Sequence, residues 1–190
     1  MEKLTKQKAQ ELLNRSTSQP HLLQHAIAVS GAMEAMAKHF GEDGEYWGAV
    51  GLLHDYDYQI HPEEHLGHTE QPLREAGVDE TTIRAIMSHG WEKCTQVKPE
   101  SNLEKSLYTV DSLTGLISAT AKMRPNGIAD LTASSVSKKY KDSGFAAKID
   151  REVIRKGVEL LNMERAKVIE ICIEGMKPYA SQLGLMGTAK

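Results

Sequence analysis

Apolar residues recur along the chain in steps of three and four, which is the spacing of amphipathic helices. The clearest series starts at Pro20, continues to Phe40 and is followed by Gly41, a residue type that commonly ends helices. Further series predict helices over residues 43–53, 69–75, 79–87, 101–121, 134–139, 150–161 and 166–183. No strand-like alternation, GxGxxG motif or P-loop lies between them, so we expect an all-α protein.

Capping residues support these boundaries. Ser18, Asp43, Asp79 and Asp150 stand where predicted helices start, and their side chains suit an N-terminal cap. The segment 101–104, Ser-Asn-Leu-Glu, is a capping box at the start of a long helix. The polar stretch 55–62 is predicted to be a loop. We therefore expect one compact helical bundle that spans residues 1–190 as a single domain.

The composition excludes several classes of protein. With 23 basic and 26 acidic residues and a net charge of −3, the chain is not expected to be a dedicated nucleic-acid binder. Its two cysteines, Cys94 and Cys172, form no CxxC pair, which excludes a disulfide scaffold and a thiolate zinc site and fits a reducing compartment. The polar first residues and the lack of a long apolar run predict a cytoplasmic protein without a signal peptide or a membrane span.

All eight histidines lie within the first 89 residues. One of them, His54, is followed by Asp55 at the point where the apolar run 50–53 gives way to the polar loop. Adjacent residues within a helix point in different directions, but at a helix end the backbone can turn both side chains toward one ion. For this pair alone, chance is the alternative explanation.

Two more residues belong with this pair. His25 lies at the edge of the apolar face of helix 20–40, where it is either a ligand or a hydrogen-bonded core residue. Asp111 leans inward on helix 101–121, and a buried carboxylate needs a metal ion or a salt bridge to a lysine or arginine. Together His25, His54, Asp55 and Asp111 offer nitrogen and oxygen donors, a set that suits Mn, Fe, Co, Ni or Zn, and Mg less well.

The order of His25, the His54-Asp55 pair and Asp111 resembles the HD-domain superfamily of metal-dependent phosphohydrolases, and most closely its short stand-alone bacterial members. Three further segments carry the resemblance, which covers about residues 20–185: Asp111-Ser112-Leu113-Thr114-Gly115, Arg124-Pro125 and Phe145-Ala146-Ala147-Lys148. It implies a helical HD fold with a metal-site core at about 20–125 and a C-terminal helical extension at about 126–185. It also implies a bound divalent metal and hydrolysis, by a metal-activated water, of a phosphate ester in a small molecule, with a nucleotide favoured.

The resemblance extends to a second metal. His65 and His89 are placed like the extra histidines of binuclear HD enzymes, with Asp55 as the bridge; the alternative is that both stay free of metal. Asp57 is the candidate catalytic residue, and it can also hydrogen-bond a ligand histidine, contact a second metal or be an ordinary loop residue. Two branches of the family carry a glutamate three residues past the HD aspartate, where this chain has Tyr58.

A phosphate substrate also needs cationic partners. We expect Arg124 and Lys138 to bind it, and Lys122 to be a solvated charge at a helix end. The other histidines are expected at the surface or in loops: His21, His39, His61 and His68.

Two other functions stay open. The Tyr58 departure leaves room for a non-catalytic HD-fold module that binds metal or nucleotide, and a purely structural helical domain is a third hypothesis. The apolar pattern of helix 166–183 fits either packing within the domain or a homodimer interface.

Overall fold

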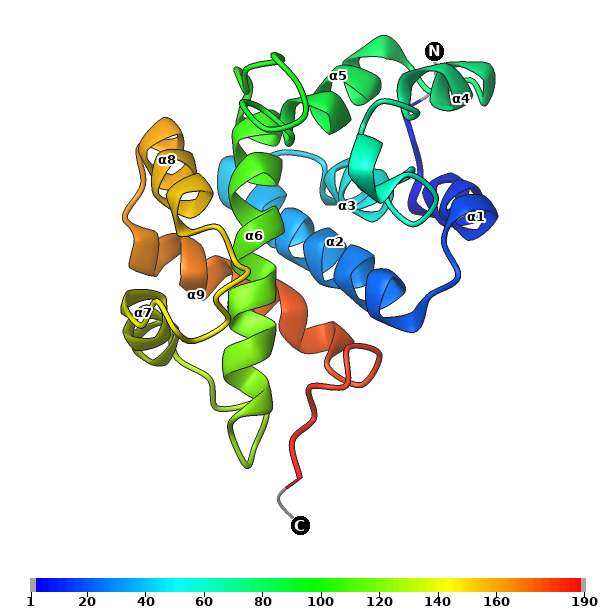
Figure 1. Cartoon of the computed structure of the whole chain (residues 1–190). Helices are drawn as coiled ribbons and strands as arrows, with labels where there is room; N and C mark the ends of the chain where they lie inside the picture. The colour runs from blue at the N-terminus through cyan, green and yellow to red at the C-terminus, as the bar shows by residue number, and fades with distance from the viewer. Residues whose placement is uncertain (1–2, 189–190) are drawn as a thin grey trace.

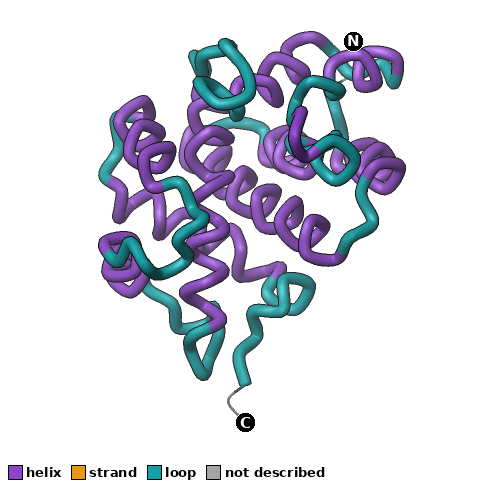
Figure 2. Tube along the Cα trace, viewed as in Figure 1, coloured by secondary structure: helices purple, strands orange, loops and turns teal. Residues whose placement is uncertain are grey.

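The computed structural model describes residues 3–188, which fold into helices joined by loops and turns (Figures 1 and 2). The all-α class is therefore confirmed. The helices are α1 Lys6–Ser16, α2 Pro20–Phe40, α3 Gly44–Leu53, α4 Glu70–Glu75, α5 Glu80–Ser88, α6 Asn102–Lys122, α7 Ala133–Lys141, α8 Arg151–Leu161 and α9 Arg165–Met176. Short 3-10 turns cover Pro62–Glu64 and Lys177–Tyr179. None of the helices in this part of the chain combines the length and apolar character needed to cross a membrane.

Most predicted caps are confirmed. The carboxylates of Asp43, Asp79 and Asp150 accept hydrogen bonds from backbone N–H groups in the first turns of α3, α5 and α8. At the start of α6, the hydroxyl oxygen of Ser101 accepts from the N–H of Glu104, and the Glu104 carboxylate accepts from the N–H of Ser101. These local bonds satisfy donors that a helix end leaves free, which is why the sequence marks these boundaries so clearly.

Two sequence expectations were wrong. Ser18 does not cap α2; the N-cap residue is Gln19, and the N–H groups of Ser18 and Gln19 donate instead to Oε1 of Gln59, at 2.8 and 2.9 Å. The last helix ends at Met176 and not near residue 183. Pro178 follows, and because its nitrogen carries no hydrogen it cannot continue the α-helical bonding pattern.

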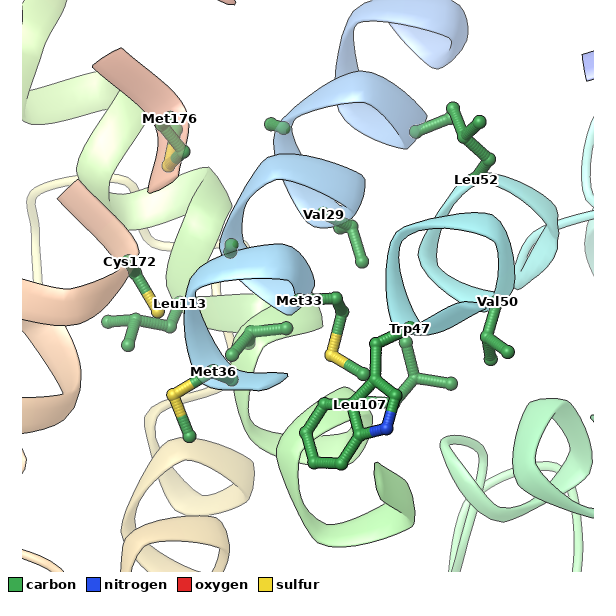
Figure 3. Packing of buried hydrophobic residues seen from close by; sticks show 14 of the residues in the cluster. Val29, Met33, Met36, Trp47, Val50, Leu52, Leu107, Leu113, Cys172 and Met176 are labelled. Carbon is green, nitrogen blue, oxygen red and sulfur yellow. The ribbon is translucent and has the colours of Figure 1, made fainter. Parts of the chain in front are cut away.

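Helix α2 is the centre of the bundle and packs against α3, α6 and α9 (Figure 1). In the close view, Met33 of α2 lies beside Trp47 of α3 and Leu107 of α6, while Cys172 comes from α9 (Figure 3). All four side chains are buried. Full burial of an apolar side chain of this size contributes about 1.5–3 kcal/mol, so this shared core fixes the relative positions of α2, α3 and α6.

Glycines allow α2 to approach α9 and α3 closely. A Cβ at Gly31 of α2 would lie 2.5 Å from the carbonyl oxygen of Gly175 in α9, and a Cβ at Gly51 of α3 would lie 2.9 Å from Cα of Ser30. Any side chain at these positions would therefore collide with backbone. The expected extension 126–185 thus packs directly on the expected core 20–125 through backbone contact between α2 and α9.

Candidate metal centre

The close crossing of α2 and α3 brings His25 and His54 together. Gly51 packs against Ser30, five residues along α2 from His25, and His54 directly follows the last residue of α3. Asp55 begins the turn after the helix, where the N–H of Tyr58 donates to its carbonyl oxygen. The helix end therefore directs the side chains of His54 and Asp55 into one space, as the sequence predicted.

Four side chains converge on this space. Nε2 of His25 lies 3.2 Å from Nε2 of His54, 3.0 Å from Oδ1 of Asp111 and 3.5 Å from Oδ2 of Asp55. Nε2 of His54 lies 3.4 Å from Oδ2 of Asp55 and 3.5 Å from Oδ1 of Asp111. His25, His54 and Asp55 form a mutually close set of donor atoms, and Asp111 joins it through its contacts with both imidazoles.

A second set of donors shares Asp55. Its other carboxylate oxygen, Oδ1, lies 3.3 Å from Nε2 of His65 and 3.5 Å from Nε2 of His89. The two Nε2 atoms are 3.1 Å apart. His65 follows the Pro62–Glu64 turn and His89 ends α5, so these residues come from segments far apart in the sequence. Asp55 thus presents one oxygen to each pair of histidines.

Hydrogen bonds at Nδ1 orient three of the imidazoles. Nδ1 of His54 lies 2.7 Å from the carbonyl oxygen of Gly51, and Nδ1 of His89 lies 2.6 Å from that of Ile86. Nδ1 of His65 lies 3.0 Å from Oδ1 of Asp57. Because each of these partners only accepts, Nδ1 carries the proton, and the Nε2 lone pair is free to bind a cation when the ring is neutral.

Asp57 orients His65, a member of this second set, through a hydrogen bond. Its side chain is buried, and besides Nδ1 of His65 it accepts from the N–H of Leu66 at 3.1 Å and the N–H of His68 at 3.0 Å. Burial raises the pKa of Asp57, but these three donors outweigh burial and the pKa lies below its ordinary value. Of the roles considered for Asp57, the contacts match hydrogen bonding to a ligand histidine.

We expect Asp57→Asn to weaken metal binding at His65 and His89 by about 10- to 100-fold, the usual cost of losing a group that orients a ligand. An asparagine keeps the shape, but its amide turns a donor toward an N–H or toward His65. Calorimetric titration of metal into the metal-free protein measures this as a weakening of one of two binding steps. Asp130→Asn, at an exposed surface aspartate, is the control, and equal binding by Asp57→Asn and wild type would contradict the orienting role.

The charges of the first set stabilise one another. Burial lowers the pKa of His54, but the carboxylates of Asp55 and Asp111 outweigh it and the pKa lies well above the ordinary histidine value. Burial raises the pKa of Asp55 and Asp111, while the histidines around them hold both pKa values well below the usual carboxyl range. The site therefore favours carboxylates together with positive charge, which a proton or a metal ion can supply.

The predicted phosphate-binding cations lie apart from these residues. Arg124, beyond the end of α6, donates from Nε to Oδ1 of Asp130 at 2.9 Å and from Nη1 to the hydroxyl of Ser135. Lys138 is exposed on α7. Within residues 3–188, neither residue forms an ion pair or hydrogen bond with the histidines and aspartates of the centre. Their role in phosphate binding stays a prediction.

A third cluster was not predicted from the sequence. His61 and His68, expected to be exposed loop residues, have near-parallel rings with centroids 3.9 Å apart, and Nε2 of His68 lies 2.8 Å from Oε2 of Glu64. The spacing of seven residues around a tight turn was the available signal. His21 and His39 are exposed on α2, as expected.

No protein-family model, curated protein or solved structure matches the chain. What the centre does must therefore be argued from its residues.

Proposed function

We propose that this chain is a metal-dependent phosphohydrolase of the HD superfamily that acts on a small phosphorylated molecule, with a nucleotide favoured. The observation that carries the proposal is the convergence of imidazoles on Asp55: His25 and His54 lie at one carboxylate oxygen and His65 and His89 at the other, while Asp111 contacts His25 and His54. Both pairs of histidines point Nε2 toward an oxygen of the same carboxylate.

The donor set fits divalent metal ions. Two ligand atoms held at right angles about 2.1 Å from one ion are about 3.0 Å apart, and the separations between histidine nitrogens, and between these nitrogens and the carboxylate oxygens of Asp55 and Asp111, run from 3.0 to 3.5 Å. Imidazole nitrogens with carboxylate oxygens suit Mn, Fe, Co, Ni and Zn. His25, His54, Asp55 and Asp111 would hold one ion, and Asp55, His65 and His89 a second.

Charge explains why a phosphohydrolase built this way needs its metal. Asp55, Asp57 and Asp111 put three carboxylates near the place where an anionic phosphate would bind, and these repel it unless cations are present. A divalent ion offsets that charge and lowers the pKa of a water bound to it. The side chains of His25, Asp55 and Asp111 are 26 %, 20 % and 28 % exposed while that of His54 has no exposure, so a substrate would reach the centre from the side of His25 and the two carboxylates.

Metal removal tests the proposal. We expect protein treated with a chelator and dialysed to lose hydrolysis of p-nitrophenyl phosphate, bis(p-nitrophenyl) phosphate and nucleoside monophosphates. Addition of Mn, Fe, Co, Ni, Zn or Mg should restore the activity with at least one ester and one metal. Lack of turnover with every metal and every ester, in protein shown to bind metal, would overturn the proposed reaction.

The alternative is a non-catalytic module that binds metal or nucleotide. One observation favours it: Tyr58 stands where related branches have a glutamate, and its ring contacts His65 with centroids 5.2 Å apart. Within residues 3–188, only Asp55, Asp57 and Asp111 place carboxylates against the four central histidines, and Asp57 is engaged by His65 and two backbone N–H groups. Tight nucleotide binding without turnover would support this alternative.

A further inference from the structure

A small hollow adjoins the candidate metal centre between α2 and α6. It has a volume of about 140 Å³. Its polar lining comes from His21, Gln24 and His25 of α2 and from Ser118 and Lys122 of α6, and its apolar lining from Ala28, Gly115 and Leu183. His25 belongs to both the hollow and the first set of metal donors, so the two spaces meet at this imidazole. The hollow is small beside ligand pockets of roughly 300–1,000 Å³, so it has room for one small group and not for a whole nucleotide.

The cation in this hollow has no anionic partner. Within residues 3–188, no carboxylate lies in ion-pair distance of Lys122, whereas the neighbouring Arg124 is held by Asp130. The other polar groups of the hollow, on His21, Gln24 and Ser118, include hydrogen-bond donors. An ammonium group with such neighbours suits a phosphate group.

The helix repeat gives the distance between this cation and the metal centre. Asp111, Ser118 and Lys122 lie at positions i, i+7 and i+11, along one side of α6. With a rise of about 1.5 Å per residue, Ser118 lies about 10 Å and Lys122 about 16 Å along the axis from Asp111. A lysine side chain extends several ångströms from its helix, so a group bound by both Ser118 and Lys122 lies on the order of 10 Å from the metal centre.

We propose that this hollow binds a second phosphate of the substrate and that Lys122 is the residue that selects for it. The substrate class is then a small bisphosphate: one phosphate at the metal centre, and a second about 10 Å away between α2 and α6. This inference rests on the proposed function, because it takes the phosphate to be cut as lying at His25 and Asp111. It also makes Lys122, and not Arg124, the principal phosphate-binding cation, although Lys122 was expected from the sequence to be a solvated charge.

The test compares a bisphosphate with its monophosphate. Hexane-1,6-diol bisphosphate and hexyl phosphate are titrated calorimetrically into wild-type protein and into Lys122→Met, each metal-free and loaded with Mn²⁺. We expect wild type to bind the bisphosphate about 10- to 100-fold more tightly than hexyl phosphate, in line with one charge-assisted contact, and Lys122→Met to lose this preference. Lys105→Met, on the same helix and also without an ion pair among the described residues, is the matched control and should keep the preference.

The outcomes separate the subsite from the reaction. Equal binding of the two ligands by wild type, or equal loss of the preference in Lys122→Met and Lys105→Met, would overturn the subsite. Binding of inorganic phosphate through Lys122 without any gain from the six-carbon linker would mean that the hollow holds free phosphate, which contradicts the substrate claim. Hydrolysis of hexyl phosphate is measured in parallel, together with the esters and metals named above. Lack of turnover with all of them in all three proteins, with a Lys122-dependent preference still present, would overturn the proposed reaction and leave the subsite standing.

Discussion

Asp55→Ala is expected to lose metal from both sets of donors and to lower the rate of phosphate ester hydrolysis at least about 1,000-fold, which corresponds to roughly 4 kcal/mol of transition-state stabilisation. The reason is geometric, because the two oxygens of this one carboxylate face different pairs of histidines. Without it, His65 and His89 keep only each other as donors. Metal content after dialysis, determined by plasma mass spectrometry, and turnover at saturating substrate measure the two effects.

Two matched aspartate variants sharpen this result. Asp111→Ala removes a donor that contacts His25 and His54 only, so we expect it to lose one metal and to keep the other. Asp130→Ala breaks an exposed pair with Arg124, which is worth about 0–1 kcal/mol, and should keep both metals and full activity. Full activity in Asp55→Ala with an unchanged circular dichroism spectrum would contradict the proposed function. Equal metal loss in Asp55→Ala and Asp111→Ala would contradict the role of Asp55 as a ligand shared by both sets of donors.

The helices that the sequence defined well are those whose signals are local. The start of α6 depends on Ser101 and Glu104, three residues apart, and the end of α2 depends on Gly41, whose φ of 72° favours glycine. Helix α1 was missed, although Ala9, Leu12 and Leu13 are buried and the Thr5 hydroxyl accepts from the N–H of Lys8. Its apolar residues are few among many polar ones, so the pattern in this window is weak.

The convergence of His25, His54, Asp55 and Asp111 was predictable for a different reason. Three of these residues can be recognised from the sequence alone. His54 and Asp55 are an adjacent pair at a helix end, and Asp111 is a carboxylate on an inward-facing stripe. The proximity of His25 depends on how closely α2 and α3 cross, and that is set by the contact between Gly51 and Ser30. Periodicity indicates which residues face inward, but not which helices meet.

The roles that the sequence could not assign depend on contacts between residues in loops and turns. The role of Asp57 is defined by N–H groups nine and eleven residues later, at Leu66 and His68, which a polar loop pattern does not reveal. The roles of the two cations at the end of α6 depend in the same way on Asp130, which pairs with Arg124 and not with Lys122. Local sequence shows where charges are available, and only the fold decides which of them are already neutralised.

The second large effect concerns the number of metals. The double variant His65→Ala/His89→Ala removes the two imidazoles that face Oδ1 of Asp55 and leaves His25, His54 and Asp111 in place. We expect the metal content to fall from about two ions per chain to about one. Without the two imidazoles, Oδ1 of Asp55 is the only donor atom left in the second set, and one donor atom does not hold a divalent ion. Hydrolysis should fall about 100-fold, since one of the two ions that position and neutralise the phosphate is gone.

A second pair of histidines from the same region provides the control. His61→Ala/His68→Ala removes two imidazoles that stack on each other, one of which, His68, contacts Glu64, so we expect any loosely bound surface metal to be lost and the metal content of the centre to stay unchanged. Metal content is compared after dialysis against a weak chelator, which strips surface ions first. If the control loses as much metal and activity as His65→Ala/His89→Ala, the loss is not specific to His65 and His89, which contradicts their role as ligands of a second ion. If neither variant loses metal, the centre binds a single ion and His65 and His89 only line the space beside Asp55.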